Sequence, residues 1–131
     1  MKRVYLLAAA LILLLGISCS QRAGSDGEAE PYRDPEALYE LITSDEPYLL
    51  IDVRSAQEVS LGYIPTAVNI PVESIGEHPL DIPKDYLVVI YCQSGVRSAR
   101  AKRILLDLGY TNVVDFGGIN RWPYDTEMPS P

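Results

Sequence analysis

Residues 86–109, YLVVIYCQSGVRSARAKRILLDLG, are the clearest indication of the fold class. Residues 86–91 are the most hydrophobic predicted strand of the chain, and this strand ends directly before Cys92. Residues 98–108 predict an amphipathic helix, which Gly109 ends. The side chains expected on the buried face of this helix are Ala101, Ile104, Leu105 and Leu108. A strand that leads through a tight loop into a helix is typical of an α/β domain.

The same alternation continues on both sides of this stretch. A helix is predicted after Asp34, because Asp is a favourable N-cap and Pro35 suits the first helical position. Residues 55–58 fit a capping box at the start of another helix. Further strands are predicted over residues 48–51, 67–70 and 113–115, then a turn at 117–118 and a helical turn over 119–122. The order predicts a mainly parallel central sheet flanked by helices, with sites at the carboxyl ends of strands, where Cys92 stands.

The N-terminus has the features of a targeting segment. Lys2 and Arg3 precede an apolar run over residues 4–17, which is shorter than the roughly 20 residues of a membrane-spanning helix. The run ends in small residues beside Cys19. We therefore predict a signal peptide over residues 1–18, a flexible, polar tether over 19–32 and one domain over 33–131.

Residues 15–19, Leu-Gly-Ile-Ser-Cys, resemble the lipobox of bacterial lipoproteins, in which the cysteine receives a diacylglyceryl group. This resemblance implies an exported protein held to a membrane of the bacterial cell envelope, periplasmic or on the outer surface, through lipid on Cys19. Several acyl chains on one residue anchor a small domain stably. The alternative is ordinary secretory cleavage near Ser18 or Ser20, with Cys19 unmodified.

The charge of the chain excludes nucleic acid as an expected partner. The first 18 residues hold two of the 11 basic residues and none of the 18 acidic ones, which leaves a net charge of −9. If Cys19 carries lipid, Cys92 is the single thiol of the exported domain. One thiol cannot form a disulfide framework, so reactivity is the better explanation for Cys92.

The loop after Cys92 is built to stabilise an anion. A free thiol ionises only near pH ~8.5, and its thiolate is the nucleophile. Gly95 can adopt a positive φ, so a tight loop can turn successive backbone N–H groups toward the sulfur. The helix that follows adds its positive dipole end, and Arg97 and Arg100 add charge. We expect a thiolate, a persulfide or a docked anionic substrate there.

The segment CQSGVRS resembles the C-x-x-G-x-R-S active loop of single-domain rhodaneses. Residues 50–54 with Glu58, and residues 62–71, are similar to the N-terminal signature of that family. Gly109-Tyr110, Gly117-Gly118 and Trp122 are similar to its closing segment, so the resemblance covers about residues 33–125. Tyr63 stands where the family usually has His, and Thr66 where it usually has Gly.

The resemblance implies a thiosulfate sulfurtransferase-like transferase that works through a persulfide on Cys92, with no metal and no organic cofactor. Cys92 and Arg97 are the implied catalytic residues. The expected substrate-binding residues are Gln93, Ser94, Gly95, Val96, Ser98 and Arg100. Asp52 and Arg54 are expected to form a structural pair that orients neighbouring loops.

The expected partners are a small sulfur-donor anion and a thiol or cyanide-like acceptor, with a protein partner as a further possibility. The alternative function is a rhodanese-like module that carries persulfide sulfur, binds a partner or senses oxidants, with little turnover of small donors.

A phosphatase is a further alternative that the loop length disfavours. Protein tyrosine phosphatases and the related Cdc25 enzymes use C-x5-R to cradle phosphate, whereas four residues separate Cys92 from Arg97. The only histidine, His78, lies in the irregular segment 72–84, far from the loop in sequence. We expect His78 to be an exposed loop residue.

Overall fold

The computed structural model describes residues 30–130. Its centre is a parallel sheet of four strands in the order β2-β1-β3-β4. The strands are β1 (Leu49–Asp52), β2 (Val68–Asn69), β3 (Val88–Cys92) and β4 (Val113–Gly118). The helices are α1 (Pro35–Ile42), α2 (Ala56–Val59), α3 (Val96–Asp107) and the 3₁₀ turn η1 (Ile119–Arg121). The predicted α/β class with a parallel central sheet is confirmed.

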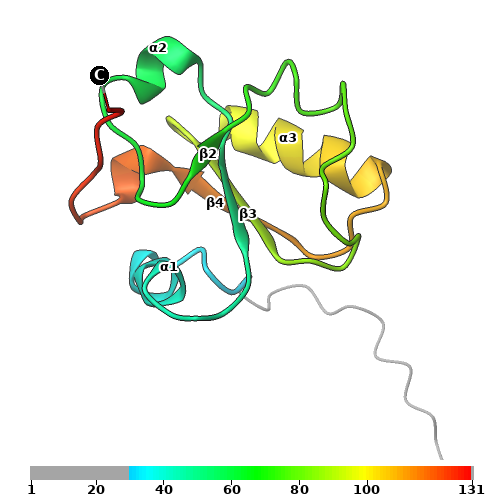
Figure 1. The fold of residues 1–131 in the computed structure, drawn as a ribbon, viewed down its shortest axis with the longest axis horizontal. Helices are drawn as coiled ribbons and strands as arrows, with labels where there is room; N and C mark the ends of the chain where they lie inside the picture. The colour runs from blue at the N-terminus through cyan, green and yellow to red at the C-terminus, as the bar shows by residue number, and fades with distance from the viewer. Residues whose placement is uncertain (1–29, 131) are drawn as a thin grey trace, which may run out of the picture.

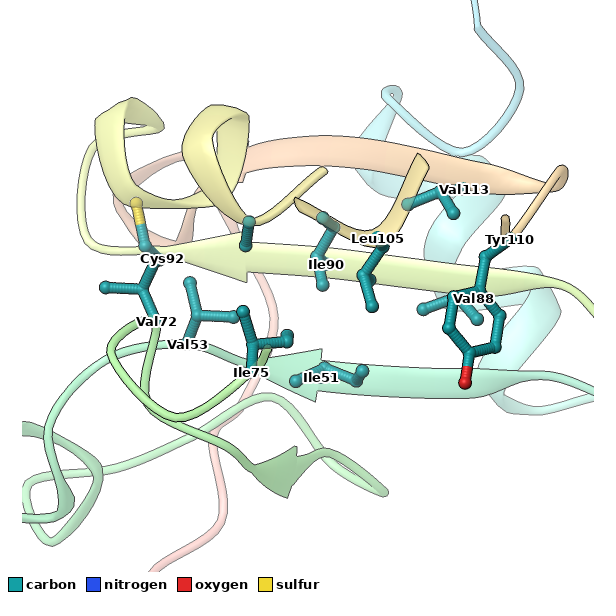
Figure 2. Packing of buried hydrophobic residues seen from close by; sticks show 11 residues of the cluster. Ile51, Val53, Val72, Ile75, Val88, Ile90, Cys92, Leu105, Tyr110 and Val113 are labelled. Carbon is teal, nitrogen blue, oxygen red and sulfur yellow. The ribbon is translucent and has the colours of Figure 1, made fainter. Parts of the chain in front are cut away.

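The two faces of the sheet carry two hydrophobic clusters, and β3 contributes to both. Because side chains alternate along a strand, Val88, Ile90 and Cys92 face the cluster that α3 covers. Val89 and Tyr91 face the cluster that contains α1 residues and Trp122. Figure 1 shows α1 and α3 on opposite sides of the sheet. Figure 2 shows Cys92 at the end of the cluster on the α3 side, where β3 stops.

The N-terminal caps read from the sequence are present in the structure. The side chain of Asp34 accepts the backbone N–H groups of Glu36 and Ala37, and Pro35 begins α1. Ser55 and Glu58 form the reciprocal bonds of a capping box at α2. Because α2 is only one turn long, these bonds involve most of the helix.

Helix α3 differs from the prediction at both ends. It begins at Val96 rather than Ser98, because Gly95 adopts φ +103° and serves as the N-cap. It ends at Asp107, and Gly109 with φ +91° then turns the chain back. The prediction that Leu108 is buried was wrong, since this side chain is 41% exposed. Tyr110 is buried instead, and its hydroxyl donates to the carbonyl of Leu80.

The outer strands also differ from the predicted ranges. β2 covers only residues 68–69, because it is an edge strand that pairs with β1 alone and Pro71 follows closely. β4 continues through Gly117-Gly118, where a turn was expected. The pairing of β4 with β3 shifts after Ile90, and Gly117 there has φ +98°. This irregularity places Gly118 opposite Cys92.

The predicted signal peptide and Cys19 lie outside the described residues. Of the predicted tether, residues 30–32 are described, and they contact the domain: Tyr32 packs against the α1-side cluster, and Glu30 forms a salt bridge with Lys102. The boundaries of the signal peptide and the tether remain predictions. Within residues 30–130, no helix combines the length and the apolar character that crossing a membrane requires.

Candidate active site

The sulfur of Cys92 lies beneath the loop that joins β3 to α3. The residue is 1% exposed, and its Sγ accepts the backbone N–H of Gly95 at 3.0 Å. The hydroxyl of Ser98, in the first turn of α3, lies 3.7 Å from Sγ. Figure 2 shows the sulfur pointing from the end of β3 toward this first turn. The strand and the helix therefore enclose the thiol between them.

These surroundings favour the thiolate. Burial raises the pKa of the Cys92 thiol, but hydrogen bonds from the backbone N–H groups of Ser98, Gly95 and Ser94, and from the hydroxyl of Ser98, outweigh burial and lower it below its ordinary value. The N-terminal end of α3 directs its dipole at the same place. Hydrogen bonds and the helix dipole thus stabilise the thiolate of Cys92.

Gly118 has no side chain, and the Cys92 loop packs closely against it. A Cβ at this position would approach the carbonyl oxygen of Gln93 to 2.6 Å and the Cα of Ser94 to 2.8 Å, closer than real contacts allow. Gly118 is also the residue that pairs with Cys92 across the sheet. The glycine pair near the C-terminus therefore belongs to the construction of the site, although it lies about 25 residues beyond the loop.

Arg97 forms a two-point ion pair with Glu58 at the N-terminal end of α3. Its Nη1 and Nη2 atoms donate to the two carboxylate oxygens at 2.7 and 2.6 Å. Both side chains are about one-third exposed. Arg97 lowers the pKa of Glu58 to about 2. Glu58 raises the pKa of Arg97, and the nearby charge of the Cys92 thiolate raises it further.

Asp52 and Arg54 form a buried ion pair beside the loop. An Nη of Arg54 lies 2.7 Å from a carboxylate oxygen of Asp52 and donates to the carbonyl of Gly62 at 2.7 Å. The other Nη reaches the side-chain oxygen of Gln93 at 3.4 Å. Burial lowers the pKa of Arg54, but its bonds to Asp52 raise it above the ordinary value. The pair thus links the end of β1, the segment at Gly62 and the Cys92 loop.

Two pockets flank the loop. One holds about 360 Å³ and is lined by Arg54, Glu58, Leu61, Gly62, Gln93, Ile119, Asn120 and Thr126. The other holds about 570 Å³, and its lining includes Ser94, Gly95, Val96, Gly118 and Arg121. The described residues include no group of three or more His, Cys, Asp or Glu side chains placed to hold a metal ion.

The remaining predicted residues lie at different distances from this centre. Val96 is 77% exposed on the rim of the loop. Arg100 is exposed on α3, and its side chain forms no hydrogen bond or salt bridge among residues 30–130. His78 is exposed, as expected. Sequence reasoning placed Glu58 in a capping box but missed it as the partner of Arg97, because the two residues are 39 positions apart.

The two departures from the family pattern have different structural settings. Thr66 adopts φ +72°, a conformation that glycine tolerates best, which gives a physical reason for the usual Gly. Its hydroxyl is bonded to that of Tyr48 at 2.9 Å. Tyr63 exchanges backbone hydrogen bonds with Glu127 in the C-terminal segment. None of these bonds involves the Cys92 loop.

Known proteins resemble this chain over the whole of the described site. The profile of the Rhodanese-like domain family matches residues 34–124. A sulfurtransferase of Allochromatium vinosum is 41% identical over 90 residues, which cover 68% of this chain and 84% of that protein. The thiosulfate sulfurtransferase PspE of Escherichia coli is 36% identical over 81 residues, which cover 60% and 74%. The solved structure of a rhodanese-like domain protein from Staphylococcus aureus is 30% identical with a TM-score of 0.66, covering 74% and 96%.

Proposed function

Since this chain belongs to the rhodanese-like domain family and shares it with sulfurtransferases, we propose that it moves a sulfane sulfur from a small anionic donor such as thiosulfate to a thiophilic acceptor. Cys92 is the nucleophile that carries the sulfur as a persulfide. The observation that supports this most directly is the hydrogen bond from the N–H of Gly95 to the buried sulfur, with Ser98 beside it.

In the first step, the thiolate of Cys92 attacks the outer sulfur of thiosulfate. A bond forms between Sγ and that sulfur, while the S–S bond of the donor breaks and sulfite leaves with the electron pair. The N–H groups of Ser94, Gly95 and Ser98 that lower the thiol pKa also stabilise the persulfide anion. The charge of Arg97 acts on the thiolate, and the part of this charge that Glu58 does not compensate assists the departing anion.

In the second step, a thiolate or cyanide attacks the terminal sulfur of the persulfide. The new bond forms on the acceptor, and the Cys92 thiolate leaves with the electron pair. Donor, acceptor and enzyme balance in electrons, so no cofactor is needed. We propose that Gln93, Ser94, Gly95, Val96 and Ser98 bind the substrate and that Arg100 guides the anion from solvent.

We also propose that Cys19 carries lipid and holds the exported domain to a membrane of the cell envelope. The lipobox-like residues 15–19 support this. Detergent partitioning of the wild type and a Cys19→Ala variant tests the anchor. The wild type is expected in the detergent phase and the variant in the aqueous phase. A wild type that stays in the aqueous phase would contradict lipidation.

A turnover assay tests the enzymatic proposal. The purified protein is mixed with thiosulfate and cyanide, and thiocyanate is measured against a Cys92→Ser control. We expect product from the wild type alone. Equal, background-level product from both proteins would contradict the enzymatic proposal. It would favour the carrier or sensor module, which requires no turnover of small donors.

A further inference from the structure

Arg97, in the first turn of α3 beside the Cys92 loop, has its positive charge compensated by Glu58. Both terminal nitrogens of Arg97 donate to the carboxylate of Glu58, at 2.7 and 2.6 Å. The pKa of Glu58 lies at about 2, so its carboxylate is charged at every pH at which the protein would work. A donor that approaches Cys92 therefore meets an ion pair and not a free guanidinium.

The carboxylate of Glu58 is held on its other side as well. Its Oε2 accepts the backbone N–H and the hydroxyl of Ser55, both at 3.0 Å, in the capping box of α2. These bonds leave Glu58 little freedom to swing away from Arg97. The position of the negative charge is therefore set by the start of α2 and not by the loop that carries the thiol.

The same neutralisation applies to the other arginine on this side. Arg54 is bonded to Asp52, and Arg54 and Glu58 both line the 360 Å³ pocket beside the loop. Apart from these two side chains, the residues that line this pocket are uncharged. The second negative charge of a donor in this pocket finds no uncompensated cation in the lining, whereas the lining of the 570 Å³ pocket includes Arg33 and Arg121 with Asp115.

We propose that Glu58 is a specificity-determining residue: by compensating Arg97, it reduces the preference of the site for donors that carry two negative charges. The inference rests on the proposed function, because it concerns the donor of that same reaction. It assigns Glu58 a role in donor selection in addition to its capping of α2.

Two donors that differ by one charge test this directly. Thiosulfate is a dianion and methanethiosulfonate a monoanion, and both bear a transferable sulfur on an oxidised sulfur atom. The readout is the ratio of their kcat/KM values at low ionic strength. The site carries a net charge of zero from this pair in the wild type, +1 in Glu58→Gln, −1 in Arg97→Gln and zero in the double variant.

We expect the ratio of thiosulfate to methanethiosulfonate to rise about five-fold in Glu58→Gln, since one uncompensated charge acts on one additional donor charge at a partly solvated site. It should fall by a similar factor in Arg97→Gln and return to the wild-type value in the double variant. Added salt should reduce these differences. A Ser60→Ala variant, which removes a hydroxyl at the other end of α2 and touches neither charge, should leave the ratio unchanged.

A ratio that stays the same in all four proteins, or that changes as much in Ser60→Ala as in Glu58→Gln, would overturn the proposal and leave Glu58 a structural residue. Alkylation separates this outcome from a failure of the proposed function, because it requires no turnover. In a Cys19→Ser background, the rate of Cys92 with iodoacetate relative to iodoacetamide should rise in Glu58→Gln. An unchanged alkylation ratio contradicts charge selection even if the protein transfers no sulfur.

Discussion

The hydroxyl of Ser98 lies 3.7 Å from the sulfur of Cys92 and at the same time 3.0 Å from the carbonyl oxygen of Gly95. The residue is fully buried, so this hydroxyl has no solvent to bond with. It can donate its one proton to this carbonyl, to the carbonyl of Gly117 at 3.3 Å, or to a thiolate. Ser98 therefore couples the charge on the sulfur to the conformation of the loop.

We expect Ser98→Ala to raise the pKa of Cys92. The hydroxyl of Ser98 lowers this pKa and burial raises it, so the effect of burial is less opposed once the hydroxyl is removed. The activity of the wild type should fall as the pH drops through the lowered thiol pKa, and the profile of the variant should be displaced to higher pH. The pH dependence of iodoacetamide alkylation measures the shift. Ser60→Ala, at the exposed end of α2, is the matched control. Coincident profiles for Ser98→Ala and wild type would contradict this role.

Replacing Gly118 by Ala should displace the active loop, since the new Cβ would meet the backbone at Gln93 and Ser94. We expect a loss of about 1–3 kcal/mol in the free energy of unfolding and at least a ten-fold loss of activity, as overpacking forces backbone shifts. Gly109→Ala is the control: Gly109 has φ +91°, so the substitution strains the backbone there, but nothing lies within 4 Å of the new Cβ. If both variants lose activity equally, the loop does not depend on Gly118.

Leu105 is fully buried in the cluster on the α3 side of the sheet. Truncation to Ala removes packing between α3 and the strands, and should lower the free energy of unfolding by about 2–5 kcal/mol. The neighbouring Leu106 is 43% exposed, so Leu106→Ala should change the free energy of unfolding by about 0.5 kcal/mol or less. Urea titration of the two variants measures both values. Equal effects would argue against the observed orientation of α3.

Thr66→Gly should stabilise the protein by about 1 kcal/mol. A β-branched residue at φ +72° costs about 1–3 kcal/mol, which the greater chain entropy of glycine offsets only in part. The lost bond between the hydroxyls of Thr66 and Tyr48 is exposed and contributes little. Thermal unfolding monitored by circular dichroism provides the check. A lower midpoint in the variant would show that this bond outweighs the backbone strain.

The sequence was most informative where structure is local. The run into Cys92, the glycine at position 95 and the caps at Asp34 and Ser55 each depend on neighbours a few residues away, and each could be predicted. The start of α3 shifted by two residues because a left-handed glycine N-cap is less recognisable from sequence than Ser or Asp.

Features that depend on distant segments could not be predicted. Local pattern identified Glu58 as a cap, but only the packing of α2 beside α3 brings it to Arg97. Likewise, Gly117-Gly118 reads as a turn from composition, whereas pairing with β3 extends β4 through it. Both contacts are tertiary, and both determine the shape and charge of the site.

Intact mass spectrometry shows whether Cys92 carries the transferred sulfur. The purified protein is incubated with thiosulfate, and its mass is recorded before and after cyanide is added. We expect an added mass of about 32 Da, one sulfur on an activated thiol, that cyanide removes and that Cys92→Ser never acquires. A wild-type mass that thiosulfate leaves unchanged, or an equal gain in Cys92→Ser, would contradict sulfur transfer through Cys92.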